Sequence, residues 1–202
     1  SAERCPAITQ CSTPGTRHWG TSATGSVTVL CTKPPDPPLA AFVRRYMDEE
    51  GTPTLQPVPG IDLDSYKDSL LERFANPYVR DQVQRLCLEA SDRIPKFVLP
   101  VVREQLAHDH PVKQSAAIVA SWARYCEGVD EQGQPIEIVD NIADDLRRRA
   151  ANLTEEPLEF LENRELFGDL VDDERFVMPY RKVLDLLHTQ GARVTINSIS
   201  SG

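Results

Sequence analysis

The sequence predicts an all-α fold, a multi-helix domain that follows an irregular N-terminal tail. Apolar residues recur at helical spacing in successive segments from Pro38 onward, and proline or glycine separates one segment from the next. The strict alternation of a half-buried strand is almost absent. With 202 residues, of which 40% are hydrophobic, the chain is long enough for one packed core. We therefore expect a tail over residues 1–37 and one helical domain over residues 38–202.

The expected tail is rich in serine, threonine, proline and glycine, and no helical or strand period persists in it. The run of prolines between Lys33 and Leu39 prevents a helix there, because each proline lacks an amide donor and restrains the residue before it. We expect an irregular or disordered segment. Its pattern allows one short strand, around residues 26–31.

The first half of the domain is divided by clear boundary signals. Gly51 ends the first helix, and the prolines of residues 52–61 predict an extended connector. Asp62 or Asp64 caps the second helix, which stops at Asn76 before a proline. Further on, Ser91 and Asp92 precede Pro95, which is the pattern of a break followed by a new helix.

The second half contains the most hydrophobic helix, which Pro111 opens and whose small residues indicate a buried position with close neighbours. Residues 128–135 read as a polar turn. Pro179 should kink the last helix or delay its start, and Gly191 should cap it. Taken together, the signals predict helices over about residues 39–50, 62–75, 77–89, 97–106, 111–126, 140–151, 155–163 and 172–190.

Charge and cysteine content restrict the class of protein. The formal net charge is −9, which disfavours a general binder of nucleic acid or of anionic membranes, because both need a concentrated positive field. No apolar run approaches the roughly 20 residues of a membrane span, and no secretory signal is visible, so we expect a cytoplasmic protein. The five cysteines are odd in number and form no CxxC pair, which indicates reduced thiols.

Motifs for self-contained chemistry are absent from the sequence. It has no G-x-G-x-x-G, no Walker loop and no G-x-S-x-G. His108 and His110 flank Asp109 in an expected turn, with a metal site as the minor alternative, and His188 is expected to be a surface residue near a helix end. The acidic clusters at residues 144–145, 155–156 and 172–174 read as helix-start charges, and the arginines at 147–149 as a solvated helix end, with an anion site as the alternative.

Arg85 and Arg93 are the candidate binding pair. They are eight residues apart, and the break signals lie between them. A helix-borne Arg85 and a loop-borne Arg93 could converge on one small polyhydroxylated or anionic ligand, because the guanidinium is a planar donor fork that stays charged. Ordinary surface salt bridges remain the alternative from chemistry alone.

Three strings carry a resemblance to a known family. They are PVPGIDLDSYKDSLLERFAN at residues 57–76, SDRIPKFVLPVVREQL at 91–106 and IVASWARYCEGVDEQGQ at 118–134. With the sequence around them, from residue 36 to residue 200, they resemble the C-terminal domain of the mannitol dehydrogenase family, the long-chain polyol-specific dehydrogenases. The resemblance implies the all-α domain of mannitol and 6-phosphogluconate-type dehydrogenases.

The resemblance also implies a reaction and a division of labour. Family members oxidise a sugar alcohol to a ketose with NAD or NADP and without a metal. A Rossmann domain holds the cofactor, and a K-x-x-x-x-N-x-x-H motif supplies the base and the groups that polarise the oxygen. Arg85 aligns with the family's substrate-binding arginine, and Arg93 stands where the family has a lysine. Asn76 and Asp81 also match family positions, and we interpret them as helix-boundary and scaffold residues.

The catalytic motif itself does not occur in this sequence, because no lysine has asparagine five and histidine eight positions later. We therefore expect no catalytic, cofactor-binding or metal-binding residues in this chain. We expect it to be a fragment that is inactive alone and that does not bind NAD or NADP by itself. A Rossmann domain supplied by another chain is one further expectation. The alternative function is a non-catalytic helical interaction module derived from the same family.

Overall fold

A computed structural model describes residues 37–55, 60, 62–75 and 89–201 of the chain. In this part, helices account for most of the chain and the only strand-like feature is an isolated bridge between Val129 and Pro135. The all-α fold class is therefore confirmed. The α-helices are α3 (Pro37–Arg45), α4 (Leu63–Ala75), α6 (Ala90–Phe97), α7 (Leu99–Ala107), α8 (Lys113–Cys126), α9 (Ala143–Ala150), α10 (Arg164–Phe167) and α11 (Glu174–Ser201).

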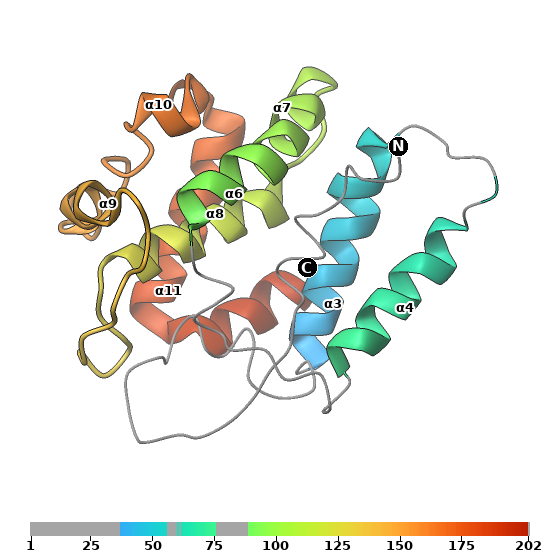
Figure 1. The fold of residues 1–202 in the computed structure, drawn as a ribbon, viewed down its shortest axis with the longest axis horizontal. Helices are drawn as coiled ribbons and strands as arrows, with labels where there is room; N and C mark the ends of the chain where they lie inside the picture. Colours follow the sequence, from blue (N-terminus) through green and yellow to red (C-terminus); the bar gives the residue numbers. More distant parts are fainter. Residues whose placement is uncertain (1–36, 56–59, 61, 76–88, 202) are drawn as a thin grey trace.

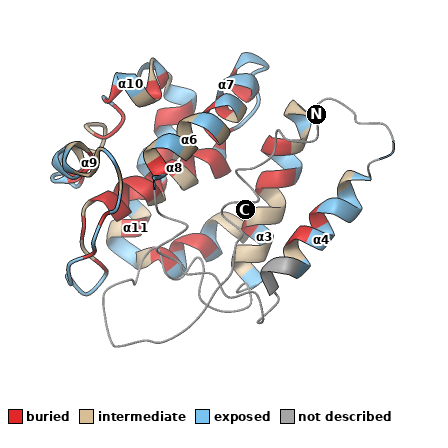
Figure 2. Cartoon of the chain, in the orientation of Figure 1, coloured by how far each residue is buried: buried red, intermediate tan, exposed pale blue. Residues whose placement is uncertain are grey.

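Helix α8 lies at the centre of the molecule, and α11 packs across it (Figure 1). Helices α9 and α10 lie to one side of this pair, whereas α3 and α4 lie to the other. The buried residues follow α8 and the inner face of α11, as the red segments of Figure 2 show. The small side chains of α8, including Ala116, Ala120 and Ala123, are fully buried and allow this close approach. The predicted central helix is thus confirmed.

An aromatic cluster of three buried rings connects α8 and α10 within the core. Trp122 of α8 meets Phe160 edge-on at 5.0 Å between ring centroids, and Phe167 lies 5.9 Å from Trp122 and 5.7 Å from Phe160. Such tilted aromatic pairs add to the free energy gained by burial, because positive ring edges face negative ring faces. Phe160 belongs to residues 155–163, which form hydrogen-bonded turns and not the expected helix. Pro157 lacks an amide donor, and many of the bonds around it span only three residues.

The first helix and its connector also differ from the sequence-based expectation. After α3 the chain widens into a π-helical turn, η1 (Tyr46–Gly51), and then tightens into a 3₁₀ turn, η2 (Thr52–Thr54). The start of the connector is therefore helical, although prolines predicted an extended segment. Helix α4 agrees closely, because Asp62 accepts hydrogen bonds from the amides of Asp64 and Ser65 and caps it as expected.

The last helix begins at Glu174, so Pro179 does not delay its start. Gly191 has φ 77° and ψ 168°, and the helix resumes beyond it as far as Ser201, so this glycine interrupts the helix where a cap was expected. A carboxylate oxygen of Glu131, in the loop after α8, accepts a 2.7 Å hydrogen bond from the Ala192 amide. The final segment then reaches α3, where the Ser200 hydroxyl donates to the Pro38 carbonyl.

Two expectations fall outside the described residues: the irregular tail with its short strand, and most of the expected helix at 77–89. Of the expected tail, only Pro37 is described, and it begins α3. Within the described ranges, no helix combines the length and the apolar character that crossing a membrane requires. Cys126 is the one cysteine described; it is buried and takes part in no disulfide.

Candidate functional site

Arg93 lies in the first turn of α6, which corrects the expectation that it is borne by a loop. The irregular residue expected between Arg85 and Arg93 is Glu89, which directly precedes α6 and has a left-handed backbone with φ 53°. The carbonyl of Glu89 then accepts the Arg93 amide at 3.2 Å, and the helix continues through Pro95 to Phe97. Arg85 lies outside the described residues, so its position relative to Arg93 stays a prediction.

Asp140 holds the start of the helix that carries Arg93. Its carboxylate accepts the Ser91 amide at 3.0 Å and the Ser91 hydroxyl at 2.5 Å, and it also accepts the Ile142 amide at 3.1 Å. The preceding carbonyl, of Val139, accepts the Glu89 amide at 3.2 Å. A carboxylate at this position satisfies free amides of the first turn and complements the positive end of the helix dipole.

This arrangement gives Arg93 a fixed backbone at the N-terminal end of a helix. Its side chain is half-buried, and its guanidinium carries donors in a rigid plane. Such a group can donate two hydrogen bonds to neighbouring hydroxyl or carbonyl oxygens without changing its own protonation. A guanidinium at this position suits hydrogen bonding to a ligand more than proton transfer.

Lys67 and Asp68, which belong to the first matching string, take part in an ion-pair network between α4 and the α3–η1 segment. Lys67 Nζ lies 2.6 Å from Asp48 and 2.7 Å from Asp64, and Arg44 contacts Asp48, Asp64 and Asp68. Burial opposes the charge on Asp48, but hydrogen bonds from Lys67 and Arg44 outweigh it and lower the pKa of the carboxyl. These residues connect two helices and leave no unpaired base for catalysis.

Glu50 is a fully buried carboxylate that the sequence reasoning missed. It accepts the Gln114 amide at 2.7 Å and the Ser115 amide at 2.8 Å, and the Ser115 hydroxyl also donates to it. These groups form the first turn of α8, whose N-cap residue Val112 provides no side-chain acceptor. The signal available in the sequence was this missing cap, because a buried helix start needs an acceptor from elsewhere in the chain.

The histidines do not form a metal site in the part of the chain that the structure covers. His108 and His110 are exposed, and their rings stack at 6.1 Å, as an exposed turn predicts. No group of three histidine, cysteine or carboxylate side chains that could hold a metal ion is found there or elsewhere among the described residues. His188 differs from expectation, because its Nε2 pairs with Glu127 at 2.6 Å and each side chain is only 17% exposed.

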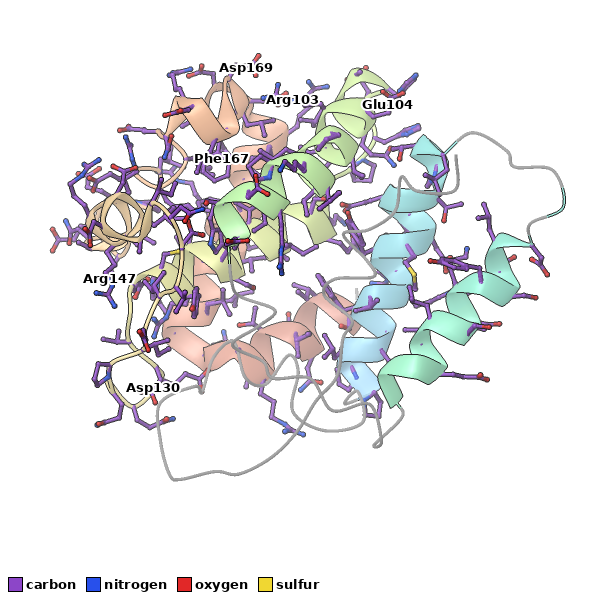
Figure 3. All side chains as sticks on the ribbon, in the orientation of Figure 1. Arg103, Glu104, Asp130, Arg147, Phe167 and Asp169 are labelled. Carbon is purple, nitrogen blue, oxygen red and sulfur yellow. The ribbon has the colours of Figure 1, made fainter. Side chains whose placement is uncertain are left out.

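The remaining charged clusters serve the fold. Asp144 and Asp145 lie in the first turn of α9, as expected, and Asp145 pairs with Arg148 and Arg149. The cluster at 155–156 begins no helix. A comparable ion pair ties α7 to the segment after α10, where Arg103 lies 2.8 Å from Asp169 and donates to the Phe167 carbonyl (Figure 3).

Comparison with known proteins defines the class to which this fold belongs. A family profile described as the mannitol dehydrogenase C-terminal domain matches residues 34–187. The chain is 40% identical over 162 residues to a mannitol 2-dehydrogenase of Phaeosphaeria nodorum, and 39% identical over 166 residues to a mannitol dehydrogenase of Saccharomyces cerevisiae. This chain belongs to the mannitol dehydrogenase family, and residues 34–187 correspond to the C-terminal domain of that family.

Solved structures agree with the assignment. The Pseudomonas fluorescens mannitol 2-dehydrogenase, in a ternary complex with NAD and D-mannitol, superposes with a TM-score of 0.82 at 29% identity, over 98% of this chain and 39% of that chain. A substrate-free D-sorbitol dehydrogenase gives a TM-score of 0.75 at 20% identity over 96% of this chain and 39% of its own, which shows the shared fold. The chain spans 28% of the Phaeosphaeria relative and 33% of the Saccharomyces relative.

Proposed function

We propose that this chain is the substrate-side domain of an NAD(P)-dependent polyol dehydrogenase of the mannitol and fructose type. The profile match across residues 34–187 carries the proposal, and two relatives that support it are mannitol dehydrogenases. The bound D-mannitol of the Pseudomonas structure supports a polyol as the ligand class. In this proposal, Arg85 and Arg93 bind oxygen atoms of the polyol or of the ketose.

The part played by this chain is binding and orientation. Oxidation of a secondary alcohol removes a hydride from carbon and a proton from oxygen, so it needs a hydride acceptor and a base. The sequence contains neither the glycine fingerprint of a dinucleotide site nor the lysine–asparagine–histidine motif of the family. The described residues likewise offer no strand–turn–helix unit to hold a pyrophosphate. We therefore expect no turnover by this chain alone.

Arg93 departs from the lysine of the family, and this departure has a chemical consequence. A lysine ammonium is a compact point charge on a flexible stem, whereas a guanidinium presents donors in a fixed plane. Arg93 should therefore hold two neighbouring oxygens of one ligand at once. Arg93→Lys restores the family residue and is expected to retain binding, although with altered preference among polyols.

The binding proposal can be tested by saturation-transfer NMR with D-mannitol and D-fructose. The wild-type chain should give a ligand signal, and Arg85→Ala and Arg93→Ala should each remove most of it. Arg148→Ala is the matched control, because it removes an exposed arginine whose partner is Asp145. Loss of signal in the control, or equal signals in all four proteins, would contradict the assignment of the two arginines.

A further inference from the structure

Helix α4 is attached to the molecule differently from the other helices. It lies at the edge beside α3 (Figure 1), and its buried apolar contact belongs to a small cluster separate from the main core. This cluster consists of Tyr46, Met47 and Leu70, with Val43, Leu71 and Ile118 partly buried against it. Of the α4 side chains described, Leu70 is the only apolar one that is fully buried. Among the described side chains of α4, apolar burial is therefore confined to Leu70 and to the partly buried Leu63 and Leu71.

Ion pairs also hold α4 against the α3–η1 segment. Three ion pairs cross from α4 to the α3–η1 segment: Lys67 with Asp48 at 2.6 Å, Arg44 with Asp64 at 3.5 Å, and Arg44 with Asp68. Two further pairs do not cross between the two segments: Arg44 with Asp48 lies within the α3–η1 segment and Lys67 with Asp64 lies within α4, and they connect the crossing pairs into one network. Shared charges of this kind give more stability than isolated surface pairs do.

Lys67 is the more buried of the two cations in the network. Its side chain is only 9% exposed, whereas its partners Asp48 and Asp64 are 40% and 74% exposed. Burial disfavours its charge, but the hydrogen bonds to the two carboxylates outweigh this and raise the pKa of the ammonium. Loss of Lys67 would leave three carboxylates around Arg44 alone, so the remaining charges would repel one another.

We propose that α4 is an electrostatic strap, which opens from α3 as a unit while the rest of the domain stays folded, and whose opening is controlled by ionic strength. Native proteins open in cooperative segments, and segments with little buried apolar area open at the lowest free-energy cost. Salt screens the crossing pairs because most of the carboxylates face water, with a Debye length that falls from about 30 Å at 0.01 M to about 3 Å at 1 M. The buried contacts of α8 lack this sensitivity.

This proposal gives a role to the Tyr66-Lys67-Asp68 string, which the polyol assignment leaves unexplained. Lys67 and Asp68 hold α4 on α3, while Tyr66 is largely exposed. The strap itself does not depend on the polyol assignment and can be tested without any ligand.

Hydrogen exchange of the backbone amides in the full chain tests the strap. Raising the ionic strength from about 0.01 M to about 1 M with sodium chloride should accelerate exchange across residues 63–72 by roughly five- to thirty-fold. Exchange in α8 should stay unchanged. If α4 exchanges at the rate of α8 at both salt concentrations, or if only its terminal amides exchange faster, the proposal is overturned.

Two variants and one control assign the effect to the network. Lys67→Met should exchange rapidly at low salt and lose the salt response, and Asp68→Asn, which changes an exposed residue, should lose part of it. Glu72→Gln removes the same charge from the same helix but lies outside the network, so it should behave as the wild-type chain does. An unchanged salt response in Asp68→Asn would overturn the proposal even if Lys67→Met failed to fold.

Discussion

The carboxylate of Glu50 accepts the backbone amide of Ser115 at 2.8 Å and its hydroxyl as well, although the two residues are 65 positions apart. One buried side chain thus supplies the cap that α8 lacks at its own N-terminus. The same contact fixes the π-helical turn η1 against the central helix. The N-terminal segment η1 and the central helix α8 are therefore connected through one carboxylate.

The cap predicts unequal costs for two substitutions of Glu50. Glu50→Ala leaves buried donors of Gln114 and Ser115 without an acceptor, and should lower the free energy of unfolding by about 3 kcal/mol. Glu50→Gln keeps an acceptor and should cost about 1 kcal/mol. Denaturant unfolding at neutral pH measures both. Equal costs would contradict the hydrogen-bonding role.

The pH dependence of stability should differ between wild type and Glu50→Gln. Burial raises the pKa of the Glu50 carboxyl above its ordinary value of 4.5, although hydrogen bonds from Ser115 and Gln114 offset part of this. The folded chain then binds the proton more tightly than the unfolded chain. The wild-type contribution is therefore full below pH 4.5 and is lost as the pH rises through the folded pKa.

Glu50→Gln lacks this titration, so the stability difference between wild type and variant should shrink as the pH rises from about 4 to about 7. Unfolding curves collected across this pH range provide the measurement. A difference that stays constant, or one that grows with pH, would show that the pKa is not raised.

Gly191 and Gly133 form a matched pair for testing the interruption of α11. Both have positive φ, at 77° and 76°, but a Cβ at Gly191 would meet a Glu131 carboxylate oxygen at 3.0 Å, whereas Gly133 has open space. Gly133→Ala should cost about 1 kcal/mol for its backbone alone. Gly191→Ala should cost about 1–2 kcal/mol more, because φ 77° with ψ 168° is a backbone region that essentially only glycine adopts and because Glu131 must also move from the Ala192 amide. Thermal unfolding that gave equal losses would argue against this.

Asp140, although it lies in a loop, should stabilise the first turn of α6. Asp140→Ala removes the acceptor of the Ser91 amide and hydroxyl, and should cost about 1–2 kcal/mol. Amide exchange of Ser91 and Arg93 should accelerate in this variant. Asp144→Ala, in the first turn of α9, is the control and should leave α6 unchanged. Slow exchange in both proteins would exclude a capping role for Asp140.

The periodic pattern predicted the elements whose boundaries are set locally. Helix α4 begins where Asp62 caps it, and α8 follows Pro111, because caps and prolines act on neighbouring residues. The pattern failed over residues 155–163, where Phe160 and Leu161 are both buried by the surrounding core without forming a helix. Tertiary packing determines the conformation of this segment, and a local sequence pattern carries no information about those long-range contacts.

The matching strings correctly identified the family. The loop expected for Arg93 was wrong, because the left-handed conformation of Glu89, which no single residue type signals, places Arg93 in a helix. The binding role of Arg93 stays a prediction. Asp140 and Glu50 act on helices 49 and 65 positions away. Contacts over such distances depend on the completed fold, so sequence spacing alone did not reveal them.

The oxidation of NADH in the presence of D-fructose tests the central claim most directly, because it requires both a substrate site and a hydride carrier site on one chain. The purified 202-residue chain is predicted to give no fructose-dependent oxidation above a protein-free control. Sustained turnover that scaled with the concentration of this chain would contradict the account, since it would place on these residues the catalytic groups that we expect to lie elsewhere.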